Sequence, residues 1–226
     1  MKRYRGIFSV IFLFAIALLP AQETLRTLED LYLSTDIEVQ LILSQAVSAD
    51  RYSKLTALDV IRDMQDGGRI PANENAIMII LSSLSGEGIT RTVHSDGRIV
   101  NNFPEVRRQA VYLLGEIGGE RAPEILYTVF ENDPEPMVLS EAILALTKTG
   151  ISDPQKASKY ISNILRSNTL RENPNNGLAS ACLTAIQDLS VVNATILTEI
   201  IDVVSGSYID KVRQQALNLI DFLRNS

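Results

Sequence analysis

The sequence has no tryptophan, one cysteine and one histidine, and aromatic residues make up only 6% of its 226 positions. The single cysteine, Cys182, excludes an intramolecular disulfide. The single histidine, His94, has no nucleophile or second ligand with which to build a catalytic triad or a zinc site. Such a low aromatic content is unusual for a β-sandwich or barrel, because aromatic residues are enriched in strands. The composition instead suits helices that pack through Ala, Leu, Ile and Val.

Motifs for cofactor and metal binding are also missing. The glycines of residues 115–119 lack the preceding strand and the Lys-Ser/Thr ending of a phosphate-binding loop, so we expect them to end a helix. No acidic loop of the calcium-binding type occurs. The central acidic residues recur at helical or turn spacing, which favours solvated surface over paired catalytic acids. They are Glu116, Glu120, Glu124, Glu131, Asp133 and Glu135. The sequence therefore predicts no cofactor, no metal ion and no catalytic residue.

Helical periodicity is the strongest positive signal, and it is clearest in residues 104–150. One helical face there carries a five-position stripe that starts at Val106. The same spacing recurs along the chain at intervals typical of helical repeats. The five stripes are Ser53, Ala57, Val60, Ile61 and Met64; Val106, Ala110, Leu113, Leu114 and Ile117; Val138, Ala142, Ala145, Leu146 and Thr149; Leu178, Cys182, Ala185, Ile186 and Leu189; and Val212, Ala216, Leu219, Ile220 and Leu223.

With short turns between its helices, the segment 51–224 resembles a HEAT-repeat protein, most closely the HEAT-like repeat of the phycobilisome lyases. The basic residue that follows the first apolar position in Val106-Arg107 and Val212-Arg213 is also common in such repeats. The stripes that begin at Val138 and Leu178 lack it. The resemblance implies an all-α, armadillo-like fold: an α-solenoid of about five antiparallel helix pairs. The lyase name implies a similarity of fold and no activity.

Capping residues and turns give the expected boundaries. Asp36 is a plausible N-cap of a helix over 36–48, and Asp133-Pro134 and Asp153-Pro154 are expected to cap the helices that follow them. Partner helices are expected to follow each stripe, and in one of them Ile196, Leu197, Ile200 and Ile201 should face inward. The other expected helices cover residues 22–34, 51–66, 72–85, 120–132 and 208–224.

Residues 86–103 interrupt the helical pattern. Ile89, Arg91 and Val93 alternate with polar neighbours, and an Asp-Gly turn follows at Asp96-Gly97. Asp-Gly between alternating segments is a strong hairpin signal. We therefore predict a small β-hairpin near residues 89–100, inserted between two helix pairs.

The N-terminus has the pattern of a secretory signal peptide. A basic segment precedes an apolar run at residues 7–19, which is shorter than the ~18 residues expected of a membrane-spanning helix. We place the cleavage after Ala21, with an uncleaved anchor as the alternative. No cysteine follows at that point, so a lipid anchor is not expected. The remaining residues would form an irregular cap (22–49), repeats (50–207) and a capping helix (208–225). The expected location is the periplasm or the cell exterior.

The charge of the mature chain limits its partners. Cleavage removes three basic residues, which changes the net charge from −6 to −9. An acidic protein lacks the basic footprint that nucleic acid requires, and general electrostatics would not hold it on an anionic membrane. After cleavage no stable membrane insertion is expected. The oligomeric state is left open.

A few single residues could carry chemistry. Cys182 occupies a stripe position that is alanine in the other four copies, which favours a buried core residue over a reactive thiol. His94 lies beside the predicted turn and is interpreted as a surface residue. Arg107 and Arg213 either bind an anionic partner or, as we expect, pair with acids of the adjacent repeat.

Three functions fit these features. The first is a non-catalytic protein–protein interaction or scaffolding protein that holds an extended partner on the concave side of the solenoid. Its expected partner-binding residues, on the outward face of the second helices, are Glu124, Thr128, Lys156, Lys159 and Glu199. Their mixed polarity favours a protein partner over a polyanion. The alternatives are an enzyme accessory subunit or lyase-like protein with the same repeats, and a structural envelope component that assembles through the ends of the solenoid.

Overall fold

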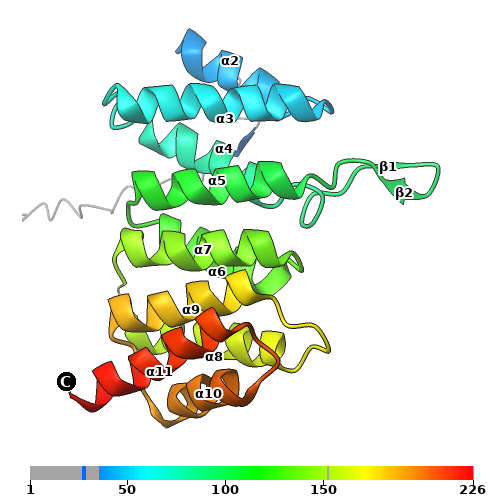
Figure 1. Cartoon of the computed structure of the whole chain (residues 1–226). Helices are drawn as coiled ribbons and strands as arrows, with labels where there is room; N and C mark the ends of the chain where they lie inside the picture. The colour runs from blue at the N-terminus through cyan, green and yellow to red at the C-terminus, as the bar shows by residue number, and fades with distance from the viewer. Residues whose placement is uncertain (1–26, 29–35, 152, 226) are drawn as a thin grey trace, which may run out of the picture.

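The computed structural model describes residues 27–28, 36–151 and 153–225. This part of the chain forms ten helices and one small two-stranded sheet, which confirms the all-α prediction. Five helices, which we call the front layer, face the viewer in Figure 1. They are α3 (Arg51–Asp66), α5 (Pro104–Ile117), α7 (Pro136–Thr149), α9 (Asn176–Leu189) and α11 (Asp210–Arg224). The back layer consists of α4 (Glu74–Ser85), α6 (Ala122–Asn132), α8 (Pro154–Thr169) and α10 (Ala194–Ser205), and α2 (Ile37–Ala46) lies at the N-terminal end.

The two layers follow the chain from one end of the molecule to the other. In the front layer α3 packs on α5, α5 on α7, α7 on α9 and α9 on α11, while the back helices pack in the same order behind them (Figure 1). Each back helix packs most extensively against the front helix that follows it in the chain. The expected partnership of the helix at 72–85 with the one at 51–66 is therefore wrong, because α4 packs chiefly against α5.

The capping predictions are confirmed at two of three positions. The carboxylate of Asp36 accepts a hydrogen bond from the backbone N–H of Glu38, and that of Asp153 accepts one from Lys156, both at 2.9 Å. Asp133 does not cap the next helix, because α7 begins at Pro136 with Glu135 in the N-cap position. The carboxylate of Asp133 is instead bound to a buried arginine, described below.

Most other boundaries agree with the prediction to within two residues. The helices expected from residues 72, 120 and 208 begin at Glu74, Ala122 and Asp210. The segment 1–21 and the helix expected at 22–34 fall outside the described residues, apart from residues 27–28. No helix in the described ranges has the length and apolar character to cross a membrane.

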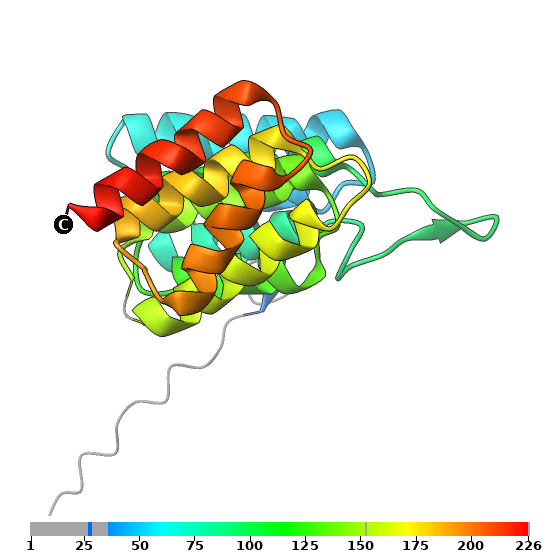
Figure 2. The same cartoon turned by 60° about the horizontal axis from the view of Figure 1, so that its bottom comes forward.

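The predicted β-hairpin is confirmed. Strands β1 (His94–Ser95) and β2 (Arg98–Ile99) are antiparallel, with His94 paired to Ile99. Asp96 and Gly97 connect them with φ angles of 51° and 74°, as a two-residue turn of the type favoured in hairpins requires. The hairpin projects beyond the helices in both views (Figures 1 and 2).

The C-terminal end of the back layer differs from the prediction. Ile196 and Ile200 of α10 are buried, but Leu197 and Ile201 are 38% and 57% exposed rather than inward. The reason lies in the order of the layers. α10 packs against α8 and α11, and no back helix follows it among the described residues.

Candidate functional site

The back layer has a regular pattern that determines where cavities form. Each back helix buries side chains at the same three positions. The residue five places after the first of these three positions lies toward the next back helix. That position holds Ser82 in α4, Tyr127 in α6 and Ser162 in α8. A large side chain therefore fills the junction between α6 and α8, whereas small side chains leave space at the other two junctions. The buried triplets are Ile77, Leu81 and Leu84; Ala122, Leu126 and Val129; Ala157, Ile161 and Ile164; and Ile196, Ile200 and Val203.

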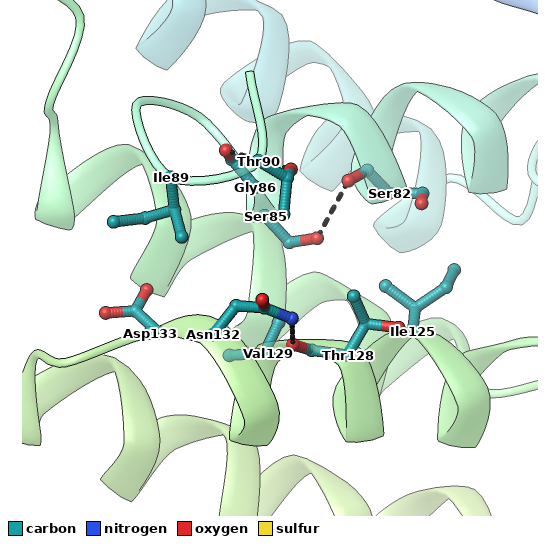
Figure 3. A pocket seen from close by; sticks show the side chains of 10 residues that line it. All are labelled: Ser82, Ser85, Gly86, Ile89, Thr90, Ile125, Thr128, Val129, Asn132 and Asp133. Atoms are coloured by element: carbon teal, nitrogen blue, oxygen red, sulfur yellow. Dashed lines mark hydrogen bonds between the residues drawn. The ribbon is translucent and has the colours of Figure 1, made fainter. Parts of the chain in front are cut away.

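The first space, which we call the α4–α6 hollow, has a volume of about 160 Å³. Figure 3 shows the end of α4 and the start of the insertion facing α6 across it. A cavity of about 150 Å³ is large enough for a benzene-sized group. The lining residues are Ser82, Ser85, Gly86, Ile89, Thr90, Ile125, Thr128, Val129, Asn132 and Asp133.

Three hydroxyls that line the α4–α6 hollow donate to backbone carbonyls. Ser85 donates to the carbonyl of Ser82 at 3.0 Å, Thr90 to Gly86 at 3.2 Å, and Thr128 to Glu124 at 3.1 Å. Because each hydroxyl has one donor and two lone pairs, these groups keep acceptor capacity. The hollow therefore offers apolar walls and hydrogen-bond acceptors, and it suits a group that brings an apolar side chain and N–H donors.

The wall at Asp133 is fixed by a buried arginine. Arg107 is fully buried, and its guanidinium forms an ion pair with Asp133, with Nε 2.6 Å from Oδ2. It also donates to the carbonyl of Glu87 at 3.0 Å and to Oδ1 of Asn102 at 2.8 Å. The expectation that Arg107 pairs with an acid from the neighbouring helices is confirmed. This arginine ties α5, the insertion and the α6–α7 turn together.

A second buried ion pair holds the other side of the insertion. Lys54 of α3 lies 3.2 Å from Glu87 and donates to the carbonyl of Ala46 at 2.8 Å. The amide of Asn101 donates to Glu87 and to the carbonyl of Arg91, at 2.8 and 2.7 Å. Buried charges are tolerated when they are paired and hydrogen-bonded. The base of the insertion is therefore fixed to the helices, whereas residues 90–100 are exposed.

A largely buried aromatic cluster between α6 and α8, which we call the aromatic ridge, separates the α4–α6 hollow from the rest of the back layer. The rings of Tyr127 and Tyr160 stack with centroids 5.0 Å apart, and Phe130 completes the cluster. Lys156 places its ammonium 4.1 Å from the centroid of Tyr127 and 2.8 Å from the carboxylate of Glu124. Burial, and then the nearby carboxylates, raise the pKa of Tyr127. The pKa of Tyr160 is raised mainly because its hydroxyl donates to Glu131.

A second hollow lies beyond the ridge, between α8 and the turn that leads to α10. It has a volume of about 540 Å³ and is more open than the first. We call it the α8–α10 hollow. Its lining residues are Pro154, Gln155, Ser158, Lys159, Ser162, Asn163, Ser190, Val191, Val192, Asn193 and Thr195.

The structure brings four of the five expected partner-binding residues to this surface. Glu124 and Lys156 form the ion pair on the ridge, Thr128 lines the α4–α6 hollow, and Lys159 lines the α8–α10 hollow. The fifth, Glu199, is only 5% exposed, so its expected outward position is wrong.

The burial of Glu199 has an electrostatic consequence. Burial, and then the charge of Asp202, raise the pKa of Glu199, while Arg166 acts in the opposite direction. The helical spacing predicted an outward position for Glu199 because the inward face of this helix was assigned to residues that include Leu197 and Ile201.

Sequence reasoning missed Ser82 and Asn132, which line the α4–α6 hollow. The signal for Ser82 is its register. It stands where α6 has Tyr127, so a small residue at that position marks an unfilled junction. Asn132 gave no comparable signal, since its amide is placed by the end of α6, where it donates to the carbonyl of Thr128 at 2.7 Å.

The remaining candidates lie elsewhere. Cys182 is fully buried, as predicted, and burial raises the pKa of its thiol. His94 is exposed in β1. Arg213 pairs with Asp210 of its own helix, so the expected pairing with an adjacent repeat is wrong there. Across the part of the chain that is described, no three or more His, Cys, Asp or Glu side chains gather as a metal ion would need.

Comparison with known proteins returned no match. No family model, no curated protein and no solved structure resembles the chain at a significant level. The function must therefore be argued from the back-layer surface itself.

Proposed function

We propose that this protein is a HEAT-like α-solenoid that binds an extended segment of a partner protein along its back layer, without catalysing a reaction. The proposal is carried by one observation: two hollows lie on the same layer, on either side of an aromatic ridge. The stacking of front and back helices in chain order, with equivalent positions buried in each, supports the solenoid assignment.

The α4–α6 hollow is the proposed anchor point. Its volume suits one branched or aromatic side chain, and its hydroxyl and amide oxygens suit the backbone N–H groups on either side of that residue. A buried apolar anchor surrounded by polar contacts is the arrangement that carries most of the binding energy in protein interfaces.

The spacing of the hollows favours an extended segment. They lie at junctions two back helices apart, and neighbouring helices pack about 8–10 Å apart, so the two hollows are separated by roughly 20 Å. An extended chain spans that distance with about six residues. Between them, the exposed Glu124 and the half-buried Lys156 lie beside the buried ring of Tyr127, which suits a segment of mixed polarity.

The proposed cellular location rests on the sequence of residues 1–21. These residues lie outside the described part of the chain, and their pattern predicts export to the periplasm or cell exterior. The proposed partner is therefore another exported protein or the exposed part of an envelope protein.

The test is site-specific photo-crosslinking of the full chain in its source cells. A photoreactive residue is placed at Thr128 in the first hollow, at Lys159 in the second, or at the exposed Thr56 of the front layer as a control. One protein crosslinked from Thr128 and Lys159, and absent from the Thr56 sample, supports the proposal.

The partner is then identified by mass spectrometry, and its crosslinked peptides are mapped. Peptides from Thr128 and Lys159 that lie within about six residues of each other support an extended segment. Equal crosslinking from all three positions, or none from the two hollows, contradicts the proposal.

A further inference from the structure

The C-terminal end of the two layers carries exposed apolar side chains at positions that the earlier helices bury, with Ser82 of α4 as the exception. In the front layer the position that faces the next helix holds Leu58, Val111, Ile143 and Leu183, all at most 1% exposed. The same position in α11 is Leu217, which is 41% exposed. In the back layer, Leu197 and Ile201 of α10, which lie on the side away from α8, are also exposed. Figure 2 brings α10 and α11 to the front, where no other helix of the described residues covers them.

Two pairs of residues at equal distances on either side of Leu217 have opposite charges. Arg213 and Asp221 lie four residues before and after Leu217, and Asp210 and Arg224 lie seven residues before and after it. Residues four and seven apart share one face of a helix. All five side chains are exposed, so this face of α11 reads acid, base, leucine, acid, base.

Such a pattern is complementary to itself when two copies run antiparallel. With Leu217 opposite the Leu217 of a second copy, Arg213 meets Asp221 and Asp210 meets Arg224, in both directions. A parallel arrangement would instead place like charges opposite each other. Two-fold symmetric interfaces are built from one self-complementary patch in this way.

The same symmetry brings the apolar surface of α10 together. A two-fold axis beside Leu217 and perpendicular to α11 sets α10 against the α10 of the second copy. There Leu197 and Ile201 would be covered by their counterparts, as the equivalent residues Ser158 and Ser162 of α8 are covered within one chain. The dimer thus continues the packing between successive helices of one layer across the end of the molecule.

We propose that the protein forms a two-fold symmetric dimer through α10 and α11, with the two α11 helices antiparallel about Leu217. This interface lies at the end of the layers and does not use either hollow. Two copies would present two binding surfaces, so the dimer would bind a repeated or paired partner with higher avidity than one copy.

The first test measures the mass of the full chain in solution by sedimentation velocity over a wide concentration range. The wild type is expected to dimerise, and Leu217→Asp should weaken dimerisation by more than about 30-fold. Leu170→Asp alters an exposed leucine outside this face and is expected to leave the dimer intact. A wild type that stays monomeric at every concentration, or a dimer that Leu217→Asp leaves unchanged, overturns the proposal.

The second test uses charge reversal. Arg213→Glu and Asp221→Arg should each weaken the homodimer by about 10-fold or more, because like charges then face each other. An equal mixture of the two variants should form a heterodimer, since every facing pair is again opposite in sign. Circular dichroism of each variant checks that it is folded. A mixture that stays monomeric while both variants are folded rejects the antiparallel arrangement, and larger open-ended species would indicate head-to-tail assembly instead.

Discussion

The position directly after the first residue of each stripe differs between the two halves of the molecule. In the N-terminal half it is a buried charge, Lys54 in α3 and Arg107 in α5, whereas further along it is the apolar Leu139 in α7 and Ala179 in α9; in the last helix it is the exposed Arg213. The backbone around these positions explains the difference. The irregular insertion brings the carbonyl of Glu87 and the side chain of Asn102 to Arg107, and buried carbonyls require donors. The later turns are short, and apolar packing suffices there.

This comparison shows that one position of a recurring helical stripe can serve two purposes. Where an insertion enters, a charged residue fastens irregular backbone to the helices. Where the chain turns directly into the next helix, the same position packs helix against helix. The N-terminal half should therefore respond most strongly to loss of a charge, and the C-terminal half to changes of volume.

The largest effect is expected from Arg107→Ala. It leaves Asp133 buried without its partner, so the free energy of unfolding should fall by about 3–5 kcal/mol. Leu139→Ala, at the equivalent position, should cost about 2 kcal/mol, at the lower end for a buried leucine. Urea denaturation followed by circular dichroism measures both.

A double-mutant cycle separates the ion pair from simple loss of side-chain volume. Arg107→Ala and Asp133→Ala should be strongly non-additive, with a coupling of up to about 3 kcal/mol. Additive losses, or a larger loss at Leu139 than at Arg107, would remove the distinction between the halves.

A change of volume should have the next largest effect. In α5, a β-carbon added to Gly115 would lie 2.7 Å from both Cα and Cβ of Ala145 in α7. Gly115→Ala should therefore destabilise the protein by about 1–3 kcal/mol, despite the better helix propensity of alanine. Thermal unfolding measures the loss.

The matched control for this contact is Gly115→Ala combined with Ala145→Gly. Removing the β-carbon of Ala145 relieves one of the two close contacts, so the double variant should recover part of the stability. If Gly115→Ala alone were as stable as the wild type, α5 and α7 would be able to move apart at this contact without loss of stability.

The α4–α6 hollow offers a test with a smaller effect on stability. Ser82→Tyr gives α4 the residue that α6 carries at Tyr127, and the new ring should fill the hollow. Stability should change by less than about 1 kcal/mol, because Ser82 is exposed. Crosslinking of a partner from Thr128 should be lost, whereas Ser82→Ala, which leaves the hollow open, should retain it. Undiminished crosslinking with Ser82→Tyr would show that the partner's anchor point is not the α4–α6 hollow.

The smallest expected effect concerns Glu199. Its pKa is raised by burial, so the folded state holds the proton more tightly, and stability falls as pH rises from roughly 4.3 through the folded pKa. Glu199→Gln should stabilise the protein at pH 7 by less than about 1 kcal/mol. The gain should shrink when the pH is lowered below the unfolded pKa, where both states are protonated. Urea denaturation at pH 7 and pH 4 measures it, with the exposed Glu172→Gln as a control for general charge effects.

The periodic pattern alone determined the helices. Five stripes at helical spacing, capping residues such as Asp36 and the Asp-Gly turn at 96–97 specified the all-α class, the hairpin and most boundaries to within two residues. These features depend on local spacing and backbone preference, which a sequence states directly. The burial of Cys182 was predictable for the same reason, since the other stripes hold alanine at its position.

Only the tertiary structure decided what lies between the helices. Asp133 looked like a helix cap, but its carboxylate pairs with the buried guanidinium of Arg107, and Glu135 holds the N-cap position of α7. Glu199 was expected at the surface and is buried, while Ile201 was expected in the core and is exposed. Both errors arise because helical spacing gives the relative angle of side chains and leaves open which neighbour covers each angle. The hollows and the uncovered end of α10 and α11 therefore became visible only once the helices were packed together.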